Sequence, residues 1–97
     1  MPKYSLVVPA YNEEKSLPLF YEAVVPMMES LQEEFEIIFV NDGSRDATKE
    51  ILKELAAQDS RVKVCSFSRN FGQQAALLCG FAEAKGDAVI AMDADLQ

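Results

Sequence analysis

The chain of 97 residues is 49% hydrophobic and 26% charged, which is enough for one small domain with its own core and for no more than one. Lys and Arg number 9 and Asp and Glu number 16, so the net charge is −7. This excess of carboxylates argues against a nucleic-acid backbone or an anionic membrane surface as a direct partner.

Short apolar runs rich in β-branched residues predict four strands, each too short for a helix and little alternated, as strands covered on both faces should be. They span residues 4–9, 36–41, 62–67 and 88–92. Between them, apolar residues recur at helical spacing over residues 17–31, 47–55 and 71–82. The order is βαβαβαβ, which predicts an α/β fold with an open, Rossmann-like parallel sheet.

The helix ends carry recognisable signals. Ser16 is the expected N-cap of the first helix, Ser44 or Asp46 that of the second, and Gly86 is expected to close the third. Pro26 falls inside the first helix and is expected to kink or split it, because proline removes a backbone donor and crowds the preceding turn.

Outside these elements the sequence offers little sign of export or membrane insertion. No apolar stretch approaches the ~20 residues of a membrane span, and residues 1–3 lead into a strand rather than a signal peptide. Cys65 and Cys79 fit no CxxC pattern, which predicts small buried hydrophobic residues in a reducing compartment rather than a structural disulfide. We therefore expect a soluble, cytoplasmic segment.

The polar clusters of the chain follow the strands. They occupy residues 9–14, 41–44, 68–72 and 93–97, whereas residues 58–61 and 85–87, which precede strands, are ordinary solvated turns. Parallel strands joined by right-handed crossovers place their carboxyl ends at one edge, where ligands of open α/β sheets bind. The asymmetry predicts a binding site at that edge.

The last cluster predicts a cation site. Asp93, Asp95 and Gln97 alternate directly after an apolar strand, and hard cations such as Mg²⁺, Mn²⁺ and Ca²⁺ prefer oxygen ligands. The alternative is an acidic turn that is merely solvated.

The first two clusters suit a nucleoside. Residues 9–14 contain no GxGxxG, which disfavours a nicotinamide oxidoreductase. Tyr11 offers a ring for stacking a base, Glu13 a carboxylate for ribose hydroxyls, and Asp42 an acceptor for a base edge beside Gly43. Alternatively, Tyr11 packs on the sheet edge, Glu13 is a first-turn helix charge, and Asp42 or Ser44 forms a helix-capping turn.

The third cluster supplies further polar groups. Arg69, Asn70 and Gln73 are candidates for phosphate or sugar contacts, although Arg69 has the alternative of pairing with surplus carboxylates, and Phe71 is expected in the core. A base-and-ribose pocket beside a cation site indicates a metal-bound nucleoside diphosphate. Glycosyl transfer from a sugar nucleotide requires that combination, because the metal assists departure of the diphosphate.

Four motifs, in order, resemble the family-two inverting glycosyltransferases, and most closely the branch of dolichyl-phosphate mannose synthases and bacterial polyprenyl-phosphate glycosyltransferases. They are VVPAYNEE at 7–14, VNDGSRD at 40–46, SRNFG at 68–72 and DADLQ at 93–97. The resemblance covers the whole chain and implies a single partial domain over residues 1–97, the N-terminal nucleotide-binding half of a glycosyltransferase A-type fold.

The resemblance also implies a set of roles. Nucleoside contacts fall on Pro9, Tyr11, Glu13 and Asp42, contacts near the phosphates or sugar on Asn70 and Gln73, and catalytic binding of Mg²⁺ or Mn²⁺ with the diphosphate on Asp93, Asp95 and Gln97. Gln73 departs from the basic residue that many relatives carry, which puts a phosphate contact there in doubt. Relatives also continue through an acceptor half and usually add membrane helices.

The expected function is therefore transfer of a hexose from a UDP- or GDP-linked sugar to an acceptor, by resemblance polyprenyl phosphate, in one inverting displacement. We expect these 97 residues to bind nucleotide without turnover and to self-associate through an exposed sheet edge, and the longer parent to act at the cytoplasmic face of the membrane. Rivals are a non-catalytic nucleotide-binding or assembly module, and a phosphoryl-transfer domain of the haloacid-dehalogenase or receiver type. The latter places an Asp after an early strand, where this chain has Pro9 and Ala10.

Overall fold

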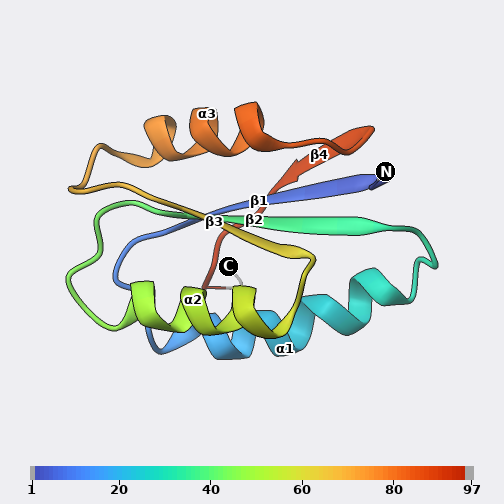
Figure 1. Ribbon diagram of the computed structural model, residues 1–97, viewed down its shortest axis with the longest axis horizontal. Coiled ribbons are helices and arrows are strands. Elements are labelled where there is room, and N and C mark those ends of the chain that lie inside the picture. Colours follow the sequence, from blue (N-terminus) through green and yellow to red (C-terminus); the bar gives the residue numbers. More distant parts are fainter. Residues whose placement is uncertain (1, 96–97) are drawn as a thin grey trace.

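The computed structural model describes residues 2–95, in which strands and helices alternate along the chain (Figure 1). The elements are β1 (Tyr4–Ala10), α1 (Ser16–Glu29), β2 (Phe35–Asn41), α2 (Thr48–Gln58), β3 (Val62–Ser66), α3 (Gln73–Glu83) and β4 (Ala88–Ala91). The predicted βαβαβαβ order is confirmed. In the described part of the chain, no helix is long and apolar enough to cross a membrane.

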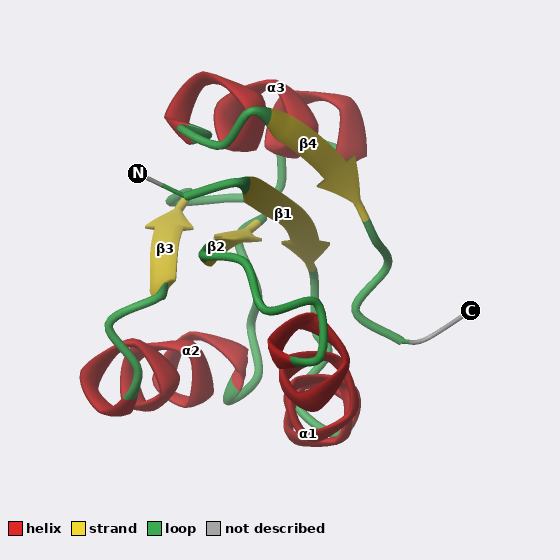
Figure 2. Cartoon of the chain, turned by 90° about the vertical axis from the view of Figure 1, so that its right-hand side faces the viewer, coloured by secondary structure: helices red, strands yellow, loops and turns green. Residues whose placement is uncertain are grey.

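The strands form one parallel sheet in the order β3-β2-β1-β4, so β1 and β2 are central and β4 lies at an edge. Figure 1 shows α3 on one face of the sheet and α1 and α2 on the other, and Figure 2 shows the same three layers from the end. The register places Val7 between Ile38 of β2 and Ala91 of β4. All four strands therefore end at the same edge.

Each face of the central strands has its own core. Toward α1 and α2, the rings of Phe20 and Phe39 meet edge to face with their centroids 6.0 Å apart, and burying such a side chain contributes roughly 1.5–3 kcal/mol. Toward α3, the helix approaches β1 closely at Gly80, where a Cβ atom would lie 2.2 Å from a methyl carbon of Val7. Ala76 of α3 packs against Ile38 and Val40 of β2.

The start of α1 differs from the prediction. Ser16 lies inside the helix and Lys15 is the N-cap, without a side-chain cap bond. The reason is that the chain already turns before residue 16, where Ser16 and Leu17 both donate backbone hydrogen bonds to the carbonyl of Glu13. The helix is not split at Pro26, which falls in its last turn and costs few internal bonds.

Of the predictions for the other two helix ends, the one for α2 holds for Asp46 and the one for α3 is wrong. The N-cap position of α2 is Ala47, but of the two side chains proposed it is Asp46 that accepts a hydrogen bond from the first helical amide, Thr48 N, at 2.9 Å. The expectation for Gly86 is wrong, because α3 ends at Glu83. The Gly86 amide donates instead to Ser5 Oγ at 2.7 Å, where the chain presses against β1.

Cys65 of β3 and Cys79 of α3 are both free, as expected, but each is partly rather than fully buried. Both pack against the small core formed by Ile38, Val40 and Ala76. Burial raises the pKa of Cys65 to about 11, with Cys79 adding to the shift. At neutral pH Cys65 is therefore a thiol that packs as an apolar side chain.

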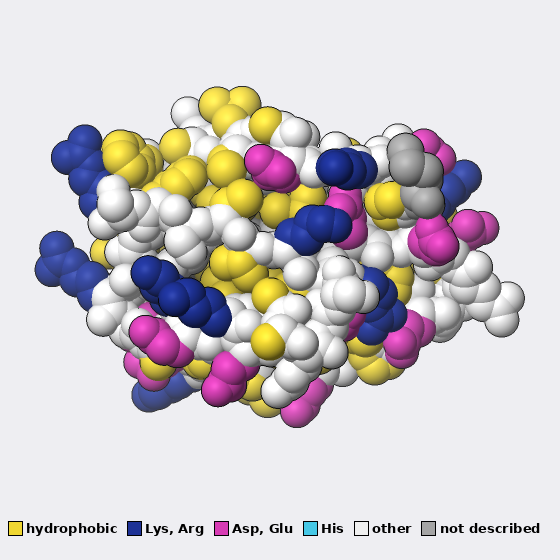
Figure 3. All heavy atoms as spheres, in the orientation of Figure 1, with side chains coloured by type: hydrophobic (Ala, Val, Ile, Leu, Met, Phe, Trp, Pro, Cys, Tyr) yellow, Lys and Arg dark blue, Asp and Glu magenta, His cyan; other side chains and the backbone are white. Residues whose placement is uncertain are grey.

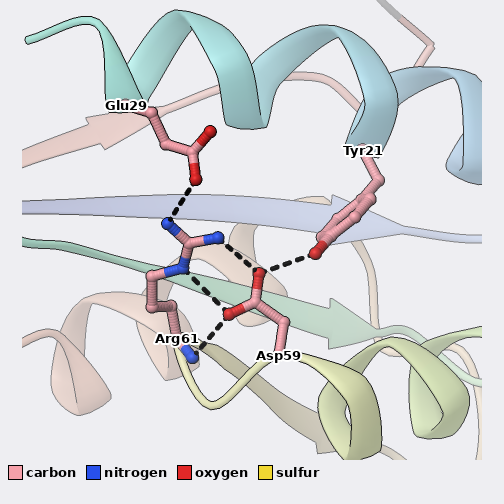
Figure 4. Close-up of polar contacts among 4 residues, drawn as sticks. All are labelled: Tyr21, Glu29, Asp59 and Arg61. Atoms are coloured by element: carbon pink, nitrogen blue, oxygen red, sulfur yellow. Dashed lines mark hydrogen bonds and ion pairs between the residues drawn. The ribbon is translucent and has the colours of Figure 1, made fainter.

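Asp59, in the turn before β3, holds together the network of side chains in Figure 4. Its carboxylate accepts hydrogen bonds from two guanidinium nitrogens of Arg61, each at 2.9 Å, from the Arg61 amide at 3.0 Å and from the hydroxyl of Tyr21 at 2.6 Å. Arg61 also pairs with Glu29 of α1 at 3.2 Å. The Arg61 hydrogen bonds hold the pKa of Asp59 well below its usual range in spite of burial.

Glu36, near the start of β2, is a second buried carboxylate, and like Asp59 it lies at the edge of the sheet where the strands begin. It accepts hydrogen bonds from Ser5 Oγ at 2.6 Å, from the Lys85 amide at 2.7 Å and from Lys63 Nζ at 3.2 Å. Burial alone would raise the pKa of Glu36, but these three donors outweigh it and the pKa is lowered. The carboxylate therefore joins β1, β2, β3 and the turn before β4.

Candidate functional site

A cleft of about 270 Å³ opens at the edge where the strands end. Its lining residues are Pro9, Ala10, Tyr11, Glu13, Asp42, Gln73, Asp93, Ala94 and Asp95. They come from the end of β1, from the chain segments that follow β1, β2 and β4, and from the first residue of α3. The predicted site residues outside this lining are Arg69, Asn70, whose side chain is hydrogen-bonded to Asp42, and Gln97, which is outside the described residues.

Backbone pairing beyond the strand ends brings these segments together. The amide of Asp42 donates to the carbonyl of Ala10 at 2.9 Å, and that of Met92 to the carbonyl of Val7 at 3.0 Å. Ala94 is buried in the core on the α1 side, whereas Asp93 and Asp95 on either side of it are exposed. Ala94 therefore anchors the segment and leaves both carboxylates at the cleft.

The loops after β1 and β2 are joined by hydrogen bonds that sequence reasoning missed. Asn12, in a left-handed conformation with φ 53°, accepts from the Arg45 amide at 2.8 Å, and its own amide donates to Ser44 Oγ at 2.9 Å. The Glu13 amide donates to Thr48 Oγ1 at 2.9 Å. Asn at a position of positive φ is a known turn signal, but its partners lie more than 30 residues away in sequence.

Within the chain, the carboxylate of Asp42 contacts the third polar cluster. Its side chain is nearly buried, at 4% exposure. Oδ1 accepts from the Phe71 amide at 2.8 Å, and Oδ2 accepts from Asn70 Nδ2 at 3.0 Å and from the Gly72 amide at 3.1 Å. The turn in this loop is closed by its neighbour, since Asn41 Oδ1 accepts from the Ser44 amide at 3.0 Å, and it is Asp46 that accepts from the first amide of α2.

Gly43 brings the second and third loops into backbone contact. It has φ 71°, and a Cβ atom there would lie 2.1 Å from the carbonyl carbon of Arg69 and 2.3 Å from the amide nitrogen of Asn70. Glycine is therefore required both for its conformation and for the space. This close approach sets the distance between the loops that carry Asp42 and Asn70.

The electrostatics of the cleft are one-sided. None of the described residues that line it is Lys or Arg. Burial raises the pKa of Glu13 above its ordinary value, and the charges of Asp95, Asp46 and Asp93 raise it further, although a hydrogen bond with Ser16 opposes them. Asp93 and Asp95 therefore lie close enough to Glu13 to act on its pKa, and carboxylate oxygens gathered in this way fit the donor set of a hard divalent cation.

Within residues 2–95 no three acidic, His or Cys side chains already form a metal cage, so a cation there requires further ligands, from the nucleotide or from residues outside this set. Two aromatic residues of the polar clusters are exposed. Tyr11 lines the cleft and is 43% exposed. Phe71, expected in the core, is 52% exposed, and the guanidinium of Arg69 lies over its ring at 4.8 Å.

A larger cleft, of about 520 Å³, lies at the opposite edge of the sheet. Its walls include Phe35, Glu36, Arg61 and Lys63. Its basic groups are already engaged, since Arg61 pairs with Asp59 and Glu29 and Lys63 pairs with Glu36. In spite of its size, this cleft therefore has no basic residue among its described lining residues that lacks an acidic partner of the chain.

Residues 5–97 match the family model described as glycosyl transferase family 2. The chain belongs to glycosyl transferase family 2. A bactoprenol glucosyl transferase of Shigella phage SfV is 52% identical over 95 residues, which are 98% of this chain and 31% of that protein. The chain thus spans about a third of the length of this family 2 relative.

Solved structures of other proteins are similar in fold to this chain. The S. aureus TarS 1-349 structure in complex with UDP superposes with a TM-score of 0.78 at 28% identity, over 96% of this chain and 27% of that one. The mannosyltransferase PcManGT from Pyrobaculum calidifontis, in complex with GDP-Man and Mn²⁺, gives a TM-score of 0.74 at 25% identity, over 97% and 28%. The expectation of a glycosyltransferase A-type half-domain is confirmed in its fold.

Proposed function

We propose that this chain is the nucleotide-binding half of a glycosyltransferase that moves a hexose from a UDP- or GDP-linked sugar to a polyprenyl phosphate. The observation that carries the proposal is the cleft at the strand ends, which the exposed ring of Tyr11 lines together with the carboxylates of Glu13, Asp93 and Asp95. The names of the relatives support it, since one is a bactoprenol glucosyl transferase and two solved neighbours hold UDP or GDP-Man.

The proposal gives separate roles to the aromatic and acidic residues of the cleft. Tyr11, with Pro9 beside it, stacks against the base, Glu13 contacts the ribose hydroxyls, and Asp42 faces the base edge from the back of the cleft. Asp93 and Asp95, with Gln97, hold Mg²⁺ or Mn²⁺ next to the diphosphate. When bound, that cation supplies Lewis-acid stabilisation of the diphosphate leaving group.

We further propose that transfer inverts the anomeric carbon in one displacement. A phosphate acceptor is already anionic, so it attacks without a general base on the protein. Since the chain spans 31% of its bactoprenol relative, we assign the acceptor site to residues outside this set. The 97 residues then bind nucleotide without turning it over, and the longer enzyme works at the cytoplasmic face of the membrane.

The exposed edge of the sheet supports the proposed self-association. Val89 and Ile90 of β4 are 43% and 42% exposed, and apolar side chains also gather over α3 at the top of Figure 3. An uncovered apolar edge strand is a template for pairing with another chain. Light scattering at rising protein concentration should therefore show a growing mass, and a constant monomer mass would contradict this part of the proposal.

Calorimetric titration with UDP, GDP, UDP-glucose and GDP-mannose, each with and without Mn²⁺, tests the function. The expected result is binding of one base class that Mn²⁺ strengthens. Metal-independent binding would contradict the cation site and favour the non-catalytic nucleotide-binding module. Absence of binding to this chain and to a longer form that includes the acceptor half would overturn the proposal.

A further inference from the structure

The three donors that Asp42 engages belong to one short segment. Phe71 N, Gly72 N and Asn70 Nδ2 all lie within 2.8–3.1 Å of its carboxylate oxygens, and Asn70 Nδ2 also approaches the carbonyl oxygen of Asp42 at 3.2 Å. This segment follows Asp42 by 28–30 residues. Its hold on Asp42 is therefore a tertiary contact between two loops.

The segment leads directly into α3. Gly72 is the N-cap of that helix and makes no side-chain cap bond, because glycine has no side chain to offer. Helix N-termini leave backbone N–H groups without intrahelical acceptors and favour a negative charge. Asp42 supplies an acceptor and a negative charge at this terminus. Its buried carboxylate accepts hydrogen bonds from the amide of the N-cap residue Gly72 and from the amide of Phe71 before it.

The first residue after this cap is Gln73, which lines the cleft together with Asp42. Asn70 does not line the cleft, and its amide group is directed at Asp42. Gly43 presses the second loop against the backbone of Arg69 and Asn70. One wall of the cleft is therefore fixed by a chain of contacts that passes through Asp42.

We propose that Asp42 is a positioning residue that caps α3 from the end of β2 and so sets the wall of the cleft at Gln73, with Asn70 as its brace rather than as a ligand contact. This inference rests on the proposed function for its consequence on nucleotide affinity. Its structural part holds for the chain without any ligand. Asp42 thereby acts on the nucleotide through the third loop, beyond any contact of its own with the base.

Amide hydrogen exchange on the ligand-free chain tests the structural part. Asp42→Asn keeps the shape of the side chain but removes its charge and one acceptor, so exchange at Phe71 or Gly72 should accelerate by at least about tenfold. Asp46→Asn is the matched control, since Asp46 accepts from the amides of Thr48 and Glu14 in the neighbouring loop. It should accelerate exchange at those two residues and leave Phe71 and Gly72 unchanged.

Asn70→Ala is the second variant, because it leaves the carboxylate in place and removes only the brace. Exchange at Gly72 should rise by a factor of about three or more, since the loop loses one of its anchors. Unchanged exchange at Phe71 and Gly72 in either variant would overturn the proposal. A rise spread evenly over the whole chain would overturn it too, because that indicates a general loss of stability.

The consequence for binding is measured with the nucleotide that the wild-type chain prefers. Asn70→Ala should weaken its affinity by about tenfold, although Asn70 does not line the cleft. Full affinity together with accelerated exchange would overturn the positioning role. Absence of nucleotide binding by the wild type would overturn the proposed function instead, while the exchange result on the ligand-free chain still decides the capping of α3.

Discussion

The carboxylates at the two edges of the sheet have opposite surroundings and opposite pKa shifts. Where the strands begin, Asp59 and Glu36 are buried with cations of their own, and hydrogen bonds from Arg61 and Lys63 help to lower their pKa values. Where the strands end, the pKa of Glu13 is raised by burial and by neighbouring acids, and none of the described residues lining the cleft is basic.

The difference separates structural from functional carboxylates. An acid that only has to hold the fold is stable when the chain supplies its counter-charge, as at the first edge. An acid that raises its neighbours' pKa costs folding free energy, and that cost is recovered when an external cation binds. The edge where the strands end is therefore the one expected to respond to a ligand.

The largest loss of stability is expected from Gly43→Ala, at the edge where the strands end. The new Cβ would lie 2.1 Å from the backbone of Arg69 at a φ of 71°, so the free energy of unfolding should fall by about 3–5 kcal/mol. Gly72→Ala is the control, since Gly72 also has positive φ but has no atom within 4 Å of the added Cβ. It should cost only about 1–2 kcal/mol in urea denaturation. Equal losses would show that the two loops are not in close contact.

The next effect belongs to the first edge, where Glu36→Ala leaves Ser5 Oγ and the Lys85 amide without their acceptor. Such buried unsatisfied groups cost about 1–3 kcal/mol each, so we expect a loss of roughly 2–4 kcal/mol. Glu22→Ala on the exposed side of α1 should change stability by no more than about 0.5 kcal/mol. If thermal denaturation finds the two variants alike, Glu36 does not join the strands.

The sequence was sufficient for much of this contrast. Apolar periodicity predicted the alternating elements, and seven of the nine residues to which the sequence assigned a role lie at one cleft, as parallel topology predicted. The pairing of loops was out of reach, because Asp42 finds its partners 28–30 residues away and no local pattern encodes that distance. Phe71 was misplaced for a related reason, since an apolar residue at the start of a helical pattern has no spacing that tells a core position from a loop position.

The Asp59 network gives an intermediate effect that depends on pH. The folded-state pKa of Asp59 lies below its ordinary value of 3.8, so its contribution is fully present above about pH 4 and is lost as the pH falls toward the folded pKa. Asp59→Asn should therefore destabilise the chain by about 1–3 kcal/mol at pH 7, with the difference shrinking toward pH 2. Glu54→Gln, an exposed neutralisation on α2, should show no comparable trend. A pH-independent difference would mean that the Asp59 charge contributes nothing.

The smallest effect on stability and the most specific effect on ligands are expected for Asp93→Asn. Removing one of the charges that raise the pKa of Glu13 should leave the free energy of unfolding within about 0.5 kcal/mol of the wild type, or slightly raise it. The gain in nucleotide affinity from Mn²⁺ should disappear, whereas metal-free affinity is retained. Asp87→Asn makes the same charge change in an exposed turn at the opposite edge and should retain the Mn²⁺ effect.

Repeating the Mn²⁺ titration of the wild type and of Asp93→Asn at several pH values tests the direction of the Glu13 pKa shift. A raised folded-state pKa means that the folded chain holds a proton on Glu13 longer than the unfolded chain does, so this group favours folding at low pH and that advantage is lost as the pH rises through the folded pKa. A cation held by Asp93 and Asp95 favours the ionised form of the nearby Glu13, so Mn²⁺ affinity should increase over the same interval. In Asp93→Asn the interval should move to lower pH, because Glu13 then faces one negative charge fewer. An unchanged pH dependence in this variant would show that the charge of Asp93 does not act on Glu13.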